Sequence, residues 1–178
     1  FNKQYSKFIY VWRFASKRRK FCIFLAIYTF LFLFTFFLAY SPFILTGKSF
    51  IWETDGRAEY YPALVYLGRY FRHLFLNFLH GDFSIPLFDI SIGVGSDIPV
   101  TLNYYGFGDP LNYLAIFVPT KYIEYLFNFL IVFRLYLAGL AFSAMSIYFG
   151  KRVAYTLIGV FVYVFSGYAI FEAVRFIE

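Results

Sequence analysis

The feature that most constrains the fold is the run FCIFLAIYTFLFLFTFFLAYSPFIL at residues 21–45, which contains no charged side chain. A helix of about 20 apolar residues crosses a hydrocarbon core about 30 Å thick. The apolar part of a cleaved signal peptide is shorter, about 7–15 residues. We therefore predict a first transmembrane helix over 21–45, ending near Pro42.

Two more apolar runs lie toward the other end of the chain. One is interrupted only by Glu124 and Arg134, and the other, from Val153 to Phe171, is free of charge. Only 15% of the chain is charged, against about 25% in soluble domains. These features predict an all-α integral membrane protein. Its expected parts are transmembrane helices over 122–149 and 153–172, a tight turn at 150–152 and the start of another outer segment at 173–178.

Basic residues predict the orientation. Residues 1–20 hold Lys and Arg but no acid, and Lys151-Arg152 forms the short turn. Short loops rich in Lys and Arg stay cytoplasmic, so we expect a multi-pass protein of a bacterial plasma membrane, with a cytoplasmic N-terminus and residues 46–121 outside. Residues 1–20 fit either a segment in the lipid headgroups or a disordered basic tail. Nucleic-acid binding is disfavoured, because this cluster adjoins a span and anionic lipids satisfy it.

Chain ends and cysteine content set further expectations. The chain begins at Phe1 rather than Met and stops just past an apolar run, so we expect the N-terminal piece of a longer protein. The single cysteine, Cys22, excludes a disulfide framework within this chain.

The large outer loop at 46–121 is expected to carry two amphipathic helices on the membrane surface. In the first, from Pro62 to His80, apolar residues recur on roughly one helical face, and Gly81 suits the position after its end. The second opens at Asp109-Pro110 and stops at Pro119. The expected face of the first consists of Leu64, Val65, Phe71, Phe75 and Leu79.

The stretch WETDGRAEYYP at residues 52–62 concentrates charge close to the first span. A helix that began at Asp55 would enclose Pro62 at a cost of about 3 kcal/mol, so we predict a loop or turn there. Glu53 and Asp55 form an acid-x-acid pair that suits Mg²⁺ or Mn²⁺. From the residues alone, Asp55-Gly56 equally fits an ordinary turn.

Several motifs in order resemble the YfhO family of bacterial polytopic membrane proteins. They are DGxxxYYP, GDFSIP, SIGVGSDI, TLNYY, GDPLNYLAIFVP and FNFLIVFRLYLAGLAF, between Trp52 and Tyr168. The family is similar to the GT-C superfamily of membrane glycosyltransferases. This resemblance implies transfer of a sugar from a polyprenyl-phosphate carrier to a cell-envelope acceptor, such as lipoteichoic acid, at the outer leaflet. The alternative is a non-catalytic transporter or scaffold for lipid-linked envelope intermediates.

The resemblance also implies site residues. Asp55 matches the essential acid of the first outer loop in GT-C proteins, either as a base or as a cation ligand. Glu59 stands where the family usually has Gln. Arg57 suits a phosphate or a pairing with Glu53 or Glu59, and Asp97 suits either an acceptor groove or a bond to its own loop.

Arg134 is expected near the middle of the bilayer, roughly 18 Å along its helix from Tyr122. A charge at that depth faces protein or a polar cavity and marks function. A lipid phosphate or a carboxylate, including one on a span outside this chain, is the expected partner.

Gly139 and Ser143 suit close helix packing, and Tyr104 and Tyr105 suit sugar stacking or interfacial anchoring.

Overall fold

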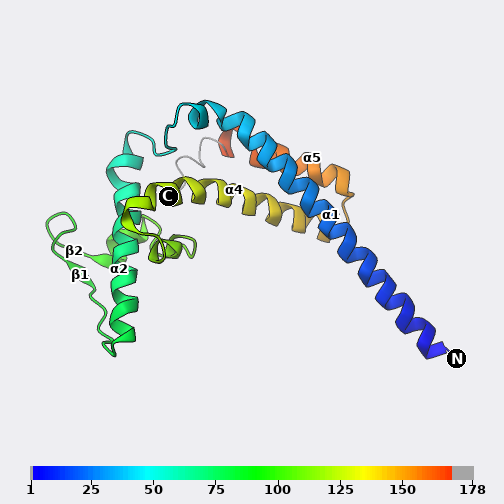
Figure 1. Ribbon diagram of the computed structural model, residues 1–178, viewed down its shortest axis with the longest axis horizontal. Coiled ribbons are helices and arrows are strands. Elements are labelled where there is room, and N and C mark those ends of the chain that lie inside the picture. Colours follow the sequence, from blue (N-terminus) through cyan, green and yellow to red (C-terminus); the bar gives the residue numbers. More distant parts are fainter. Residues whose placement is uncertain (1, 170–178) are drawn as a thin grey trace.

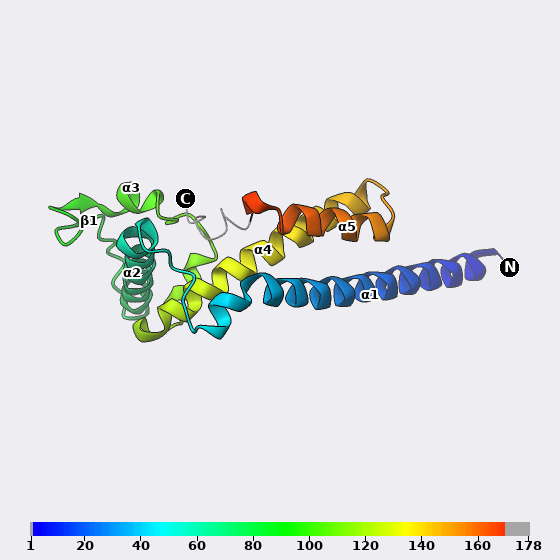
Figure 2. The same ribbon diagram turned by 90° about the horizontal axis from the view of Figure 1, so that it is seen from above.

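A computed structural model describes the backbone of residues 2–169 and the side chains of residues 21–169. Three helices run roughly along the long axis: α1 (Asn2–Leu45), α4 (Ile123–Tyr148) and α5 (Val153–Val164). The helix α2 (Tyr61–Leu79) lies crosswise at one end of them. Figure 2 confirms this arrangement, because α2 is seen nearly end-on there while α1 and α4 still run lengthwise. A chain built this way is the helical protein that the sequence predicts.

The helix α1 packs through one row of aromatic side chains. Its buried residues recur every fourth position, which keeps them on one helical face. Neighbouring rings of the row are in contact. In the closest pair, Phe36 and Tyr40, the ring centroids are 4.5 Å apart. Large apolar side chains on the remaining surface stay exposed, as expected for a helix that faces lipid. The buried row consists of Phe24, Tyr28, Phe32, Phe36 and Tyr40.

The first span is longer as a helix than predicted. Its helix already starts at Asn2 and includes Pro42, so it is about 66 Å long at 1.5 Å per residue. The backbone of residues 2–20 continues α1 as a helix. Pro42 does not end the helix, because its carbonyl still accepts bonds from the backbone N–H and the hydroxyl of Thr46.

Two stretches, Phe21–Leu45 and Thr120–Tyr148, are long and apolar enough to cross a membrane among the described residues. The predicted helix at 122–149 is thus present as α4. The predicted continuous helix at 153–172 is wrong: α5 ends at Val164, and its 12 residues cover only about 18 Å. Ser166 then accepts a bond from the N–H of Ala169 and starts a new turn. Residues 170–172 lie outside the described part.

Segment 46–121 contains more elements than predicted. A π-helical turn, η1 (Gly56–Tyr60), leads directly into α2. A two-stranded antiparallel hairpin follows, in which Phe88 pairs with Asp97 and Asp89 with Ser96. The two strands of this hairpin are β1 (Phe88–Asp89) and β2 (Ser96–Asp97). They are followed by the helix α3 (Ile98–Asn103) and the 3₁₀ helices η2 (Asn112–Ile116) and η3 (Thr120–Tyr122).

The helix α2 is present as predicted, but its buried face differs. Leu64 is buried as expected, whereas Phe75 and Leu79 are exposed. The buried face follows Ala63, Leu64, Leu67, Gly68 and Tyr70 because η2, α3 and α4 pack against the first half of the helix. Gly68 permits this approach, since a Cβ there would lie 3.0 Å from the carbonyl oxygen of Ala115.

The predicted helix after Asp109 is a 3₁₀ helix with one face buried in the protein, while Tyr113 and Leu114 on it stay exposed. Asn112 and Ala115 of η2 are fully buried between α2 and α4. Arg72 of α2 fixes the end of η2 by donating to the carbonyl oxygens of Ala115, Ile116 and Val118 at 2.6–3.2 Å. A short helix whose last carbonyls are unpaired is stabilised by such a cation.

Candidate functional site

The acidic stretch lies on a helical turn rather than in a loop. Asp55 already has helical backbone angles, and the N–H of Tyr61 donates to the carbonyl of Gly56, five residues earlier. Pro62 explains the π geometry, because a proline ring clashes with the carbonyl four residues before it and a widened turn relieves that clash. The cost of an enclosed proline is therefore avoided by a local change in helix type. Turns of this kind occur frequently at functional sites.

Trp52 stabilises this turn through a backbone hydrogen bond and a ring contact. Its carbonyl accepts the N–H of Arg57 at 3.0 Å, and its ring packs against Gly56 so closely that a Cβ would lie 2.5 Å away. The Trp52 ring also lies 5.3 Å from that of the buried Tyr60. The backbone of the turn is therefore held by packing, while Glu53, Asp55, Arg57 and Glu59 project outward and are exposed.

Tyr105 connects the acidic turn to the loop after α3. Its hydroxyl donates to Oε2 of Glu59 at 2.9 Å. Burial, the bond to Glu59 and the nearby charge of Asp55 together raise the pKa of Tyr105. Tyr105 therefore keeps its proton at neutral pH and remains a donor. Asp55 lies close enough to influence Tyr105, but its carboxylate does not cap the turn.

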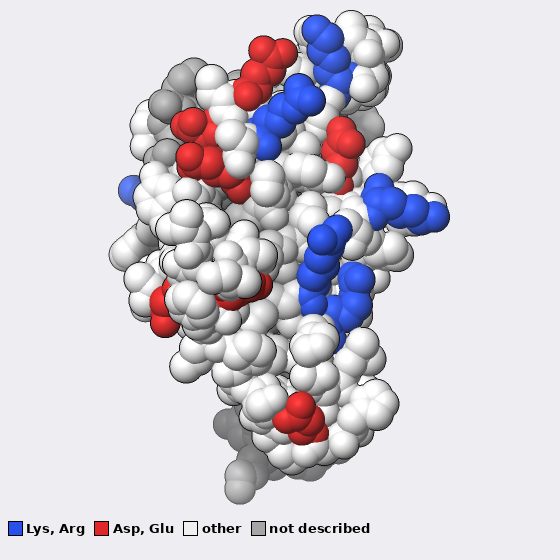
Figure 3. All heavy atoms as spheres, turned by 90° about the vertical axis from the view of Figure 1, so that its left-hand side faces the viewer, with Lys and Arg blue, Asp and Glu red and all other residues white. Residues whose placement is uncertain are grey.

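The end face of the molecule shows how the charges are distributed. Acidic side chains gather in its upper part, where Figure 1 places the chain between α1 and α2, and basic ones lie beside and below them (Figure 3). Across the described residues, Arg57 forms no ion pair, so the predicted pairing with Glu53 or Glu59 is absent. No three metal-ligating side chains gather within that part of the chain either. Glu53 and Asp55 fit only a Mg²⁺-type ion that takes one or two carboxylates and completes its shell with phosphate and water.

Arg134 has a carboxylate partner, and it comes from this chain. Its Nη2 lies 2.7 Å from Oδ2 of Asp109 and 2.8 Å from Oδ1 of Asn112, and its Nε donates to the same Asp109 oxygen at 3.2 Å. Oδ1 of Asp109 accepts the N–H of Leu111 in a turn that precedes η2, so Asp109 does not cap a helix that opens at Pro110: η2 begins at Asn112 and has no side-chain cap. Segment 46–121 therefore reaches well down the length of α4. Irregular backbone at such a depth is tolerated where protein buries it or a cavity adjoins it.

A cavity of about 610 Å³ adjoins this ion pair. It lies between the loop after α3, the middle of α4 and the end of α5. Arg134 and Asp109 are the only charged residues in its lining within the described part of the chain. Ile131, Leu135 and Val164 give it an apolar wall. The cavity is therefore an apolar chamber with one ion pair.

Tyr104 brings the cavity and the acidic turn together. It lines the cavity, its ring lies 5.2 Å from that of Tyr105, and Tyr105 binds Glu59. Asp97 is not part of this group: it is exposed, lies outside the cavity lining and accepts the N–H of Val100 as the cap of α3. Of the predicted residues, the structure brings Asp55 and Glu59 close to Tyr105, and it places Arg134 in the adjoining cavity.

Sequence reasoning missed the roles of three residues. Asp109 was interpreted only as a helix cap and Asn112 was not considered, although the ion pair uses both. Tyr105 was weighed only as a sugar-stacking or anchoring ring, whereas its hydroxyl holds Glu59. A signal for Asp109 existed, because a buried arginine requires an acid and few acids lie near the predicted span.

Comparison with known proteins identifies the family. No curated protein matches the chain, and no solved structure matches it. A family model described as "Bacterial membrane protein YfhO" matches residues 22–177. This match covers nearly the whole chain, including both candidate spans, the acidic turn and the cavity. The chain therefore belongs to the YfhO family of bacterial membrane proteins.

Proposed function

We propose that this chain is the part of a membrane glycosyltransferase that moves a sugar from a polyprenyl-phosphate carrier to a cell-envelope acceptor. The observation that supports this most is the apolar cavity with one ion pair beside a rigid turn of exposed carboxylates. A lipid-linked donor needs an apolar site for its chain, a polar site for its phosphate and a carboxylate for the acceptor. The family resemblance favours an envelope polymer such as lipoteichoic acid as that acceptor.

In the proposed reaction, Asp55 acts as the general base. The acceptor hydroxyl oxygen forms a bond to the anomeric carbon, and its proton passes to the Asp55 carboxylate. The bond between the anomeric carbon and the phosphate oxygen breaks, and the carrier phosphate leaves with the electron pair. Glu59, held by Tyr105, orients the sugar or acceptor hydroxyls. In the other role that the resemblance implies for Asp55, Glu53 and Asp55 would instead hold a Mg²⁺ or Mn²⁺ ion, which would offset charge on the leaving phosphate.

The test is sugar transfer in membranes that contain the full-length protein. The probes are polyprenyl-phosphate-linked glucose, galactose and N-acetylglucosamine, each radiolabelled. We expect Asp55→Asn to lower the transfer rate about 10²-fold or more, because a positioned base contributes about 10²–10⁴-fold. Asp82→Asn is the matched control, since Asp82 is exposed on the same segment and bonds only its own loop.

Transfer by Asp55→Asn at the wild-type rate would overturn the role of Asp55 and favour a transporter or scaffold. A rate that is lost with a chelator, returns with Mn²⁺ and responds to Glu53→Gln would support the cation. An unchanged transfer rate after chelation would contradict a role for the cation.

A further inference from the structure

Arg134 is only partly used by its protein partners. Nε and Nη2 bind Asp109 and Asn112, but Nη1 is buried and has no partner among the described residues. The side chain is only 20% exposed. A buried donor without a partner is costly, and this one belongs to a residue that lines the cavity. Nη1 itself has almost no accessible surface, so a ligand oxygen in the cavity would satisfy it once a small shift of the neighbouring side chains opened the way.

The arginine is held in place before any ligand arrives. Oδ2 of Asp109 accepts two of its N–H groups, and Asp109 is itself fixed by the N–H of Leu111. The fully buried Asn112 accepts a third bond and donates to the carbonyl of Gly106. Since each partner is anchored to backbone, Nη1 has little freedom to move. A fixed donor binds without an additional ordering cost.

Charge limits which ligand suits this site. Arg134 and Asp109 cancel each other, and no other charged residue lines the cavity in the part of the chain that the structure describes. Both remaining N–H groups of Arg134 are on Nη1, so they converge on one phosphate group rather than on two separate anions. A second negative charge would lie close to the Asp109 carboxylate, with no further cation among the described lining residues to offset it, which is unfavourable in an apolar chamber.

We propose that Arg134 Nη1 binds one phosphate oxygen of a lipid phosphodiester, and that Asp109 selects this singly charged headgroup over a phosphate monoester. The inference deepens the proposed function, on which it rests, because a sugar-bearing carrier phosphate is a diester and the released carrier is a monoester. The same selectivity would favour entry of the donor and release of the spent carrier. Asp109 is then a positioning and specificity residue.

Binding to the purified full-length protein in neutral detergent tests the proposal. The probes are dioctanoyl phosphatidylglycerol, a diester; dioctanoyl phosphatidic acid, a monoester; uncharged dioctanoylglycerol; and inorganic phosphate. We expect the diester to bind at least tenfold more tightly than the other three. Arg134→Gln should remove that preference. Arg69→Gln, which changes an exposed arginine of α2, should leave it unchanged.

Asp109→Asn gives a readout that a purely structural role would not produce. It leaves the charge of Arg134 uncompensated, so we expect the preference to shift at least tenfold toward the monoester. Wild-type protein that binds dioctanoylglycerol or phosphatidic acid as tightly as the diester overturns the proposal, and this result needs no variant. Tight binding of inorganic phosphate would overturn the lipid assignment.

Two comparisons keep the result interpretable. Should Arg134→Gln fail to fold, Arg134→Lys replaces it, because lysine keeps the charge but lacks the planar fork; unchanged diester affinity would then contradict the proposal. Asp55→Asn should bind the diester like wild type while losing transfer. Loss of transfer with normal binding therefore separates the two proposals.

Discussion

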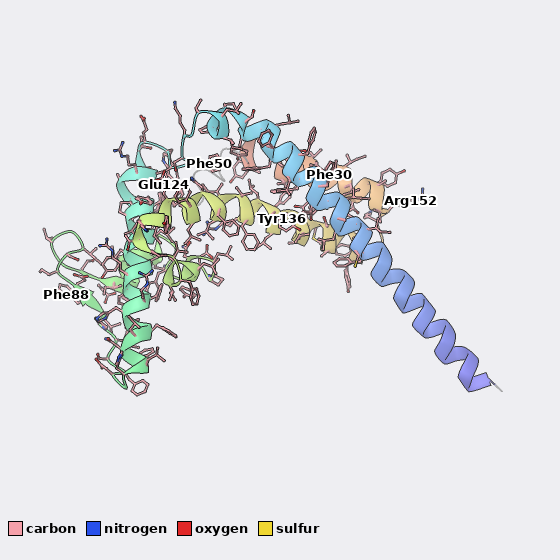
Figure 4. The ribbon with its side chains drawn as sticks, viewed as in Figure 1. Phe30, Phe50, Phe88, Glu124, Tyr136 and Arg152 are labelled. Atoms are coloured by element: carbon pink, nitrogen blue, oxygen red, sulfur yellow. The ribbon has the colours of Figure 1, made fainter. Side chains whose placement is uncertain are left out.

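Gly139 is the residue on which contact between the long helices depends. A Cβ at this position would overlap the Tyr28 hydroxyl of α1 and lie 3.0 Å from Val160 of α5. That hydroxyl donates to the carbonyl of Tyr136 at 2.9 Å, and Figure 4 shows Tyr136 on α4 beneath α1. The sequence suggested close packing here from the spacing of Gly139 and Ser143. It could not reveal that a tyrosine hydroxyl fills the space.

We expect Gly139→Ala to destabilise the protein by about 1–3 kcal/mol, because overpacking forces side chains or backbone to shift. Thermal unfolding of the full-length protein in detergent measures this. Gly167→Ala is the control, since no atom of the described residues lies within 4 Å of a Cβ there and its φ is not in the left-handed region. Adding Tyr28→Phe should make the combined loss smaller than the sum of the two single losses. Strict additivity would contradict a direct clash.

Arg134 shows what sequence predicts at the residue scale and what it does not. Its depth in an apolar run predicts a charge that faces protein or a polar cavity, with either a lipid phosphate or a carboxylate as its partner. Asp109 lies 25 residues earlier, and a local turn or cap is reason enough for an Asp-Pro pair at that place in the sequence. Only the folding of segment 46–121 onto α4 shows that the Asp109 carboxylate both accepts the N–H of Leu111 and pairs with Arg134.

At the scale of elements, the hairpin is joined to α2 by side chains. Tyr66 of α2 donates to Oδ2 of Asp89 at 2.6 Å, and Tyr70 donates to the carbonyl of Pro86 at 2.9 Å. The bonds from Tyr66 and from the N–H of Ser91 lower the pKa of Asp89. Burial, followed by the Asp89 bond, raises the pKa of Tyr66, so Tyr66 remains the donor.

The lowered pKa of Asp89 makes hairpin docking dependent on pH. A carboxylate with a lowered folded pKa contributes stability above its unfolded pKa of about 3.9 and loses it as pH falls through the folded value. We expect Asp89→Asn to speed amide hydrogen exchange at residues 86–97 at pH 6, and the difference from wild type to shrink below about pH 4.

Asp82→Asn is the matched control for this exchange experiment. The pKa of Asp82 is also lowered, chiefly by bonds from Ser84, but these bonds do not connect the hairpin to α2. Each variant is compared with wild type at the same pH, because exchange itself depends on pH. A difference for Asp89→Asn that persists unchanged at low pH would contradict the role of the charged carboxylate.

Helices were predictable where a long apolar run or a Pro or Gly boundary determined them. They were not predictable where a local hydrogen bond determined their ends or their type. Long apolar runs gave α1 and α4, and the Pro62 and Gly81 boundaries gave α2. The end of α5 follows from a Ser166 side-chain bond that hydropathy does not detect. At η1, Pro62 widens an existing helical turn instead of starting a helix. The expectation of a loop or turn assumed that proline cannot be enclosed in a helix, and it therefore missed the π-helical turn.

At the scale of the whole molecule, the two ends differ in charge and in structure. The α4–α5 turn with Arg152 and the N-terminal half of α1 lie toward one end, and the hairpin with Phe88 lies at the other (Figure 4). The two crossings that the sequence predicts between the basic clusters would put both clusters at the same end. If the basic end is cytoplasmic, the acidic turn lies at the outer side of the membrane, where a lipid-linked donor would be used.

Cysteine labelling in intact cells tests that orientation. The background variant is Cys22→Ser, because Cys22 is exposed on α1. Ser91→Cys places a thiol on the hairpin loop and Lys151→Cys places one in the α4–α5 turn, both at exposed positions. We expect a membrane-impermeant maleimide to label position 91 in intact cells and position 151 only after the cells are permeabilised. The reverse pattern would put Asp55 in the cytosol and remove the proposed reaction, while labelling of both in intact cells would mean that α4 does not cross the membrane.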